Sequence, residues 1–231
     1  MNKGKILTYK ILNYALPTAI FAMVLASIII MFSIGANAFN LFSYFTIQSN
    51  ILIALFALFL IVANILKDTG KADITNKIPF LIVLIMILNI VLTGVVYLTM
   101  LLPEDIKNGA FIMGASQVSN IMLHGAVPLL SLIYFLVFTE KKKVKLVNTY
   151  VFILYPIVYW GFTLLRSLSG IKFMGDSLFP YFFLDPEFNN QGFGKVLMYV
   201  SFLLILFYAV GLLLTLLSNH ICKKKTLNKE Q

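Results

Sequence analysis

Charged residues and cysteine are scarce in this chain. Aspartate, glutamate, lysine and arginine together make up 12% of the 231 residues, whereas 60% are hydrophobic. So few charges do not cover the surface of a soluble domain of this size, which excludes an ordinary soluble protein. The single cysteine, Cys222, excludes an intrachain disulfide and carries no information on the redox compartment.

Long apolar runs dominate the sequence instead. A helix needs about 20 apolar residues to cross the hydrocarbon layer of a membrane. Runs such as ILIALFALFLIVANIL are apolar on every side, unlike the alternating pattern of membrane β-strands. The sequence therefore predicts an all-α polytopic membrane protein with six transmembrane helices, as one domain over residues 1–231. The predicted spans are residues 13–35, 44–66, 79–102, 118–139, 147–168 and 195–218.

The lysines predict the orientation of these helices. Segments rich in lysine and arginine stay on the cytoplasmic side of a membrane. Of the 18 lysines and arginines, 14 lie before the first span, after the second, after the fourth and after the last. With six spans these four segments share one side, so both termini are predicted to be cytoplasmic.

The net charge of +9 is explained by this topology signal and by attraction to anionic lipid headgroups. No basic patch with interleaved aromatic residues indicates nucleic-acid binding. We expect an integral protein of a prokaryotic cell membrane with membrane lipids as partners and no nucleic acid. The richness in lysine, isoleucine and asparagine is typical of an AT-rich prokaryote.

Several polar residues inside the spans lie at matching depths. Polar side chains within a membrane are costly and usually face the protein interior or a cavity. Counted from the lysine that bounds each helix, Thr46, Asn120 and Arg166 lie 21 residues away, or about 31 Å along a helix. Asn50 and His124 lie 17 residues away, or about 25 Å, one helical turn deeper.

Helical spacing places these residues on shared faces, because residues three or four apart are neighbours on a helix. The shared faces are those of Thr46 and Asn50, of Asn120 and His124, of Thr93 and Tyr97, and of Tyr159, Thr163, Arg166 and Ser167. The pattern predicts an outward-facing pocket lined by the second to fifth helices. The plainer interpretation is that each residue only bridges packed helices, and that Arg166 anchors in the headgroup layer.

The residues of the predicted pocket favour acyl-transfer chemistry without a cofactor. The two histidines fall at opposite membrane faces, so a metal or haem site with two histidine ligands is not expected. No carboxylate lies within a predicted span, which argues against a proton pump. A hydroxyl activated by an imidazole base remains. The candidate nucleophile is Thr46 and the candidate general base is His124. Asn50 or Asn120 could orient the ring or donate to an oxyanion, and Arg166 could pair with a fatty carboxylate or with developing charge. The candidate supporting residues are Tyr97, Tyr159 and Thr163.

Three segments resemble the androgen-induced membrane hydrolase family, whose members hydrolyse fatty acid esters of hydroxy fatty acids. They are YFTIQSN at 44–50, SNIMLHGAVPLL at 119–130, and YPIVYWGFTLLRSLSG with FPYFFLDP within 155–186. The chain is more similar to the prokaryotic six-helix branch. The resemblance implies that the family's threonine falls on Thr46, within Tyr-x-Thr, and that its histidine falls on His124. Gly125 and Pro128 are expected to loosen the helix around that histidine.

The leading hypothesis is an intramembrane threonine hydrolase that takes a lipid-like ester from the outer leaflet. The alternatives are a non-catalytic transporter or lipid-binding membrane protein that uses the same residues, and a structural subunit. The connection at 169–194, rich in aromatic residues, is predicted to be either a lid or an interfacial belt. The oligomeric state stays open.

Overall fold

The computed structural model describes residues 3–107, 109, 114–173 and 176–230, with the side chains of all of these except Lys3 and residues 224–230. Over these residues the chain is helical and contains no β-strand. Six helical segments are long and apolar enough to cross a membrane, which confirms the predicted fold class. These segments are Gly4–Ser33, Phe45–Asp68, Phe80–Lys107, Ala115–Val137, Leu146–Ser167 and Gly192–Lys223.

The first and last helices extend further than the predicted spans. The first begins at Lys3 rather than at residue 13, and the last runs on to Glu230 rather than ending at 218. The prediction marked only the apolar part of each helix. A helix satisfies its own backbone hydrogen bonds, so it continues through polar residues beyond the apolar part.

The helices group into two compact units. Unit 1 comprises Met1–Ala36 and Thr46–Glu140, and unit 2 comprises Asn37–Phe45 and Lys141–Gln231. The prediction of a single domain over the whole chain stays a prediction.

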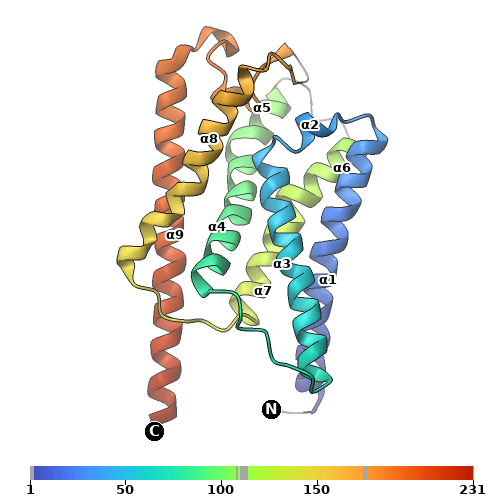
Figure 1. Ribbon diagram of the computed structural model, residues 1–231, viewed down its shortest axis with the longest axis vertical. Coiled ribbons are helices and arrows are strands. Elements are labelled where there is room, and N and C mark those ends of the chain that lie inside the picture. Colours follow the sequence, from blue (N-terminus) through green and yellow to red (C-terminus); the bar gives the residue numbers. More distant parts are fainter. Residues whose placement is uncertain (1–2, 108, 110–113, 174–175, 231) are drawn as a thin grey trace. The chain divides into compact units, whose positions relative to one another are not determined.

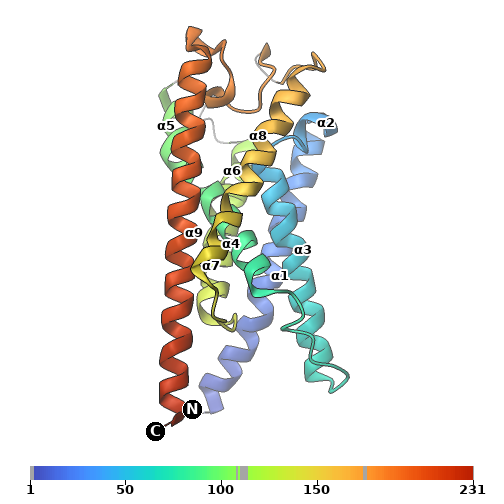
Figure 2. The same cartoon turned by 60° about the vertical axis from the view of Figure 1, so that its left-hand side comes forward.

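Unit 1 is a bundle in which the α6–η2–α7 helix packs against both α1 and α4 (Figures 1 and 2). Its elements are α1 (Lys3–Ser33), α3 (Phe45–Asp68, of which Phe45 belongs to unit 2), α4 (Phe80–Val96), η1 (Tyr97–Leu101), α5 (Leu102–Lys107), α6 (Ala115–Ile121), η2 (Met122–Ala126) and α7 (Val127–Val137). The segments α4–η1–α5 and α6–η2–α7 are continuous helices, each interrupted by one π-helical turn. The apolar core between them includes Leu84, Ile87, Val127 and Phe135, all at most 1% exposed.

Unit 2 is built on the packing of α9 against η3, α8 and η5. Its elements are α2 (Ala38–Leu41), η3 (Leu146–Ile153), α8 (Leu154–Ser167), η5 (Phe182–Leu184), η6 (Phe188–Asn190) and α9 (Gly192–Glu230). Gly211 lets α9 approach η3 closely, because a Cβ there would lie 2.3 Å from the Phe152 ring. Near the other end of the contact, the Asn219 amide bonds both the N–H and the C=O of Val144, at 2.8 and 2.9 Å.

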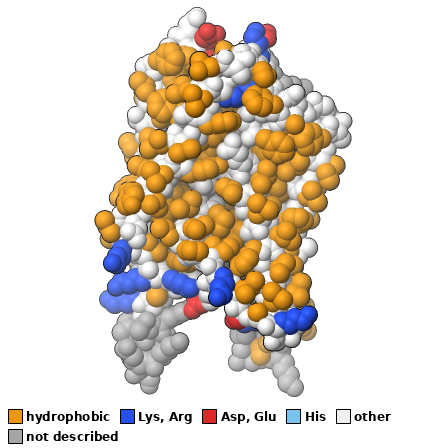
Figure 3. Space-filling model, viewed as in Figure 1, with side chains coloured by type: hydrophobic (Ala, Val, Ile, Leu, Met, Phe, Trp, Pro, Cys, Tyr) orange, Lys and Arg blue, Asp and Glu red, His pale blue; other side chains and the backbone are white. Residues whose placement is uncertain are grey.

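The surface carries large apolar side chains that a soluble protein would bury. Leu168, Leu165 and Val147 are 81%, 72% and 71% exposed. Figure 3 shows hydrophobic side chains over most of the visible face, with lysines gathered toward one end. Exposed apolar area on this scale is typical of a surface in contact with lipid.

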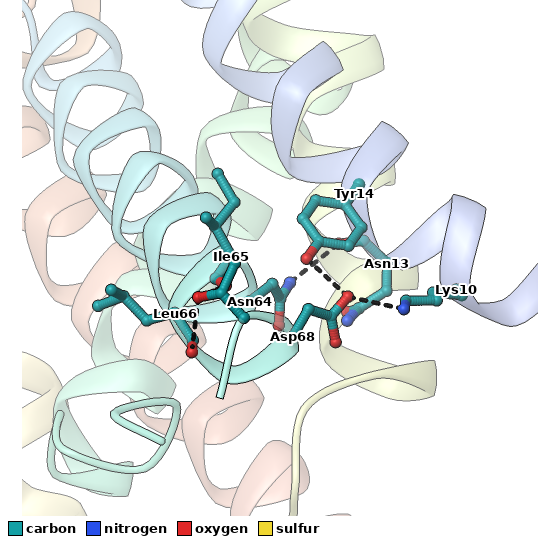
Figure 4. Close-up of polar contacts among 8 residues, drawn as sticks. Lys10, Asn13, Tyr14, Asn64, Ile65, Leu66 and Asp68 are labelled. Carbon is teal, nitrogen blue, oxygen red and sulfur yellow. Dashed lines mark hydrogen bonds and ion pairs between the residues drawn. The ribbon is translucent and has the colours of Figure 1, made fainter. Parts of the chain in front are cut away.

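At the lysine-rich end of unit 1, polar contacts tie α1 to α3 (Figure 4) and also to α7. Asp68 at the end of α3 pairs with Lys10 at 3.0 Å and accepts a hydrogen bond from Tyr14 at 2.9 Å. Asn13 on α1 accepts two further hydrogen bonds. Asn64 Nδ2 donates to its carbonyl at 3.3 Å, and the Tyr134 hydroxyl donates to its Oδ1 at 2.9 Å. These contacts fix the helix ends opposite the polar cluster described below.

Gly94→Ala should lower the melting temperature of the detergent-solubilised protein. A Cβ at Gly94 would lie 2.9 Å from the backbone oxygen of His124 and 3.2 Å from Pro128 Cβ, so α4 and η2 would have to separate. Overpacking of this kind costs about 1–3 kcal/mol. The matched control is Gly125→Ala, where nothing lies within 4 Å and no loss is expected. A melting temperature for Gly94→Ala equal to that of the control would contradict this packing.

Candidate functional site

Eight buried polar side chains of unit 1 lie along three helical segments and form what we call the unit 1 polar cluster. They are Thr46, Ser49 and Asn50 on α3, Asn89, Thr93 and Tyr97 on α4 and η1, and Gln117 and His124 on α6 and η2. None is more than 7% exposed. On each segment the members recur at three, four or seven residues, which places them on one helix face.

The His124 ring is held from two sides. Its Nδ1 lies 3.4 Å from the backbone oxygen of Thr93, and the ring stacks on Tyr97 with centroids 4.2 Å apart and planes 18° apart. The Tyr97 hydroxyl in turn accepts a hydrogen bond from Gln117 Nε2 at 3.0 Å. A carbonyl oxygen only accepts, so Nδ1 carries the proton in the neutral ring and Nε2 keeps its lone pair.

A π-helical turn surrounds the histidine. Pro128 has no N–H to donate to the His124 carbonyl four residues earlier, and its ring crowds that carbonyl in a regular α-helix. The chain widens instead into η2, where the Val127 N–H bonds Met122 O, five residues back. This is the loosening expected next to Pro128. Turns of this kind occur often at functional sites.

Asn50 joins α3 to the histidine segment. Its Nδ2 donates to Thr46 O at 2.8 Å and to Leu123 O at 3.2 Å, the residue before His124. Both N–H groups of the amide are therefore used by backbone carbonyls. The reversed orientation would place Oδ1 against two oxygens, so the observed one is required. The Oδ1 atom of Asn50 remains as a hydrogen-bond acceptor for a ligand.

A second link joins α3 to α4. The hydroxyls of Ser49 and Thr93 lie 2.7 Å apart, so that one donates to the other, and Thr93 Oγ1 also lies 2.9 Å from the Asn89 carbonyl. Together with the Asn50 contact, this link makes α3, α4 and η2 meet around Thr93 and His124.

Thr46 is the second residue of α3 and is 7% exposed. Its carbonyl accepts from Asn50 Nδ2 and from Ser49 Oγ, the latter at 3.0 Å. One side-chain amide thus connects the backbone of Thr46 to the backbone next to His124. The contacts that the structure shows for the His124 ring are those with Thr93 and Tyr97, and the pairing of Thr46 Oγ1 with His124 Nε2 stays a prediction.

The structure brings Thr46, Asn50, Tyr97 and His124 into the unit 1 polar cluster, and the other four predicted site residues are described separately. Asn120 is half-buried on α6, one turn before His124. The remaining three, Tyr159, Thr163 and Arg166, belong to α8 in unit 2.

Arg166 is the hub of unit 2, in the sense that its guanidinium bonds several separate segments of that unit. It is 4% exposed, and its NH1 donates to the carbonyls of Ile171 at 2.7 Å and Leu178 at 3.2 Å. Its Nε donates to Ser43 Oγ at 3.3 Å, and NH2 donates to Asn40 Oδ1. Four of the five N–H groups of a guanidinium are thus bound to the chain's own acceptors. This arrangement fixes part of the 169–194 connection against α8, while the interpretation of that connection as a lid stays a prediction.

The surroundings of Arg166 are aromatic. The guanidinium carbon lies 3.8 Å from the centroid of the Phe173 ring, which adds a cation–π contact. Tyr44 packs edge-on against the same Phe173 ring at 5.2 Å. Burial raises the pKa of Tyr44, and the positive charge of Arg166 acts in the opposite direction. Because the net shift is upward, the Tyr44 phenol stays protonated at neutral pH.

The other two predicted residues of α8 bond within unit 2. Tyr159 donates to Ser43 O and accepts from Phe45 N, both at 3.0 Å. Thr163 Oγ1 donates to the carbonyl of Trp160 on its own helix, at 2.7 Å. These two residues therefore help to attach the 37–45 segment to α8 and to satisfy the backbone.

Three members of the unit 1 polar cluster were missed from the sequence: Ser49, Asn89 and Gln117. Each lies at helical spacing from another member of the cluster, and this spacing could have identified it. Ser49 lies three residues after Thr46, Asn89 lies four before Thr93, and Gln117 lies seven before His124. Among the residues that the structure describes, no three histidine, cysteine or acidic side chains lie close enough to hold a metal ion.

Arg166→Lys should loosen the connection after α8. A lysine has one point charge and does not reproduce a planar fork bound to four acceptors. Loss of one or more charge-assisted hydrogen bonds, each worth about 1.5–3 kcal/mol, predicts amide hydrogen exchange at residues 171–173 and 176–184 at least about 10-fold faster than in wild type. Lys172→Ala is the control, because Lys172 is exposed and pairs only with exposed Asp176. Unchanged exchange in Arg166→Lys would refute the role of Arg166 as the hub of unit 2.

No protein-family model, no curated protein and no solved structure matches this chain. The resemblance to the androgen-induced membrane hydrolases therefore stays a prediction. What the chain does has to be argued from the two buried polar groups, one around His124 and one around Arg166.

Proposed function

We propose that the chain is an intramembrane threonine hydrolase that acts on lipid or fatty acid esters, with Thr46 as nucleophile and His124 as general base. The observation that carries the proposal is the orientation of the His124 ring. Its Nδ1 faces the Thr93 carbonyl and its face stacks on Tyr97, so Nε2 is the nitrogen able to take a proton. A base whose other nitrogen is fixed by an acceptor is the arrangement that activates a hydroxyl nucleophile.

In the proposed reaction Thr46 Oγ1 attacks the ester carbonyl while His124 Nε2 accepts the hydroxyl proton. The tetrahedral intermediate collapses to an acyl-Thr46 ester, and the imidazolium returns the proton to the departing alcohol. Thr46 lies in the first turn of α3, at the positive end of the helix dipole. A negative oxygen forming beside Thr46 is stabilised there.

The surroundings support a neutral, lipid-like substrate. No member of the unit 1 polar cluster is charged when His124 is neutral. The helix α4, which carries Asn89 and Thr93, also has Leu84, Leu88 and Leu92 fully buried. An apolar site with few polar anchors suits an ester with an acyl chain better than a charged metabolite.

A second candidate function is non-catalytic lipid binding or transport. The observation that favours it is Asn89, whose side-chain nitrogen and oxygen are buried without a hydrogen-bond partner among the described residues. A polar group of a bound ligand would satisfy both atoms. This function requires no covalent intermediate.

Covalent labelling separates the two functions. With an aryl fluorophosphonate or a fluorescent ester probe, wild type should be labelled, Thr46→Ala should not, and His124→Ala should be labelled at least about 100-fold more slowly. Thr99→Ala is the matched control, since Thr99 Oγ1 bonds its own helix at Val95 O and should label like wild type. Equal labelling of all four proteins would rule the mechanism out. Binding of lipid without labelling of any protein would favour the second function.

The six apolar helices indicate an integral membrane protein, and we propose further that it lies in a prokaryotic cell membrane with both termini in the cytoplasm. The lysine distribution supports this orientation. In a Cys222→Ser background, a membrane-impermeant maleimide should label Ser169→Cys in intact cells. It should label Ala72→Cys only after permeabilisation. Both positions are exposed, and the reversed labelling pattern would invert the topology.

A further inference from the structure

Two asparagines of the unit 1 polar cluster have buried amide atoms without a partner. Among the residues that the structure describes, no hydrogen-bond partner reaches Asn50 Oδ1, Asn89 Oδ1 or Asn89 Nδ2. The two residues are 0% and 1% exposed. Each buried polar group left unpaired is destabilising, and within a membrane no bulk solvent compensates for it. The cluster therefore needs a partner that the described part of the chain does not supply.

The free atoms define what that partner is. Asn50 offers an acceptor only, since both of its N–H groups bond the carbonyls of Thr46 and Leu123. Asn89 offers one acceptor and two donor hydrogens. A cation would satisfy the oxygens and be repelled by Asn89 Nδ2, and an anion would satisfy only that nitrogen. Water donates and accepts, so it satisfies all three atoms.

We propose that Asn50 and Asn89 hold water inside unit 1, beside the contact between His124 and Thr93, and that this water hydrolyses the acyl-enzyme. Asn50 bonds the carbonyl next to His124, and Asn89 lies one turn before Thr93 on the same helix. The water site stands on these contacts alone, whereas its catalytic role rests on the proposed function.

The hydrolytic step needs no further reactant. The water oxygen attacks the carbonyl carbon of the acyl-Thr46 ester, and His124 Nε2 takes one water proton. The bond from the carbonyl carbon to Thr46 Oγ1 then breaks, and the imidazolium gives its proton to that oxygen. The products are a fatty acid and the free Thr46 hydroxyl. Asn50 and Asn89 act as positioning residues, because they hold the water and do not touch the reacting carbon.

Asn89→Leu is the variant that tests the site. Leucine is similar in size and removes the unpaired amide without breaking a side-chain hydrogen bond, so the melting temperature should not fall. The first measurement is radiolytic hydroxyl-radical footprinting of the full-length protein, which oxidises buried side chains that touch bound water. Residues 84–93 of α4 should be oxidised in wild type and at least about 5-fold less in Asn89→Leu. In the matched control Ser131→Ala, which removes a buried hydroxyl bonded to Val127 O, the oxidation should be unchanged.

The second measurement is the lifetime of the acyl-enzyme. With a p-nitrophenyl ester of a medium-chain fatty acid, the burst of nitrophenolate should be the same in wild type and in Asn89→Leu. The acyl-Thr46 adduct, followed by intact mass, should persist at least about 10-fold longer in the variant. Ser131→Ala should match wild type in both quantities.

Each outcome decides one part of the proposal. Wild type without oxidation in residues 84–93 overturns the water site. Oxidation that disappears in Asn89→Leu, with an unchanged adduct lifetime, overturns the catalytic role of the water. If wild type forms no adduct at all, the proposed function fails, and footprinting alone still decides whether the water is there.

Discussion

The hydrogen bond between His124 Nδ1 and the Thr93 carbonyl is the contact on which the rest of the unit 1 polar cluster depends. It joins η2 to α4, and it selects the tautomer of the only imidazole in the cluster. The Thr93 carbonyl is accessible to the His124 ring because α4 changes to η1 at Tyr97. The Tyr97 N–H is there shared between Thr93 O and Gly94 O. The residue that relaxes the backbone at this point also supplies the ring on which His124 stacks.

Two small features of sequence make that contact possible. Pro128 removes the N–H that would bond the His124 carbonyl in an α-helix, and the chain responds with the wide turn of η2. Gly94 provides room for that displaced carbonyl, since any Cβ there would lie too close to it. A proline on one helix and a glycine on its neighbour thus bring α4 and η2 together at the histidine.

Much of this architecture was predictable, because the bilayer is a strict constraint. A span has to be apolar for about 20 residues and helical throughout, so hydropathy alone predicted six helices. Depth along each span placed Asn50 and His124 at one level, and in the structure the Asn50 amide bonds the carbonyl of Leu123, the residue before His124. The two terminal helices extend beyond the predicted apolar spans, because hydropathy does not detect the part of a helix that continues into water.

The depth of a residue within the membrane does not say which helices pack against each other. The residues of the site could therefore be predicted from depth only in part. Arg166 lies at the depth of Thr46 in sequence, yet its acceptors are within unit 2: the Asn40 and Ser43 side chains and two carbonyls of the connection after α8. Backbone carbonyls have no sequence signature, so a guanidinium bound to them looks the same as one available to a ligand. The π-turns also rotate every later residue on the helix, which changes the face that a spacing rule assigns.

The lack of a cation among the described members of the unit 1 polar cluster has a chemical consequence for the proposed reaction. A neutral ester enters an apolar site at little electrostatic cost, whereas the carboxylate formed from it is costly in the same surroundings unless a cation pairs with it. The described members of the unit 1 polar cluster include no cation, and four of the five N–H groups of Arg166 are bound within unit 2. Under the proposed function, the ionised product would therefore be held less well than the neutral ester. Such a site would release the fatty carboxylate toward the headgroup layer, where water stabilises the charge.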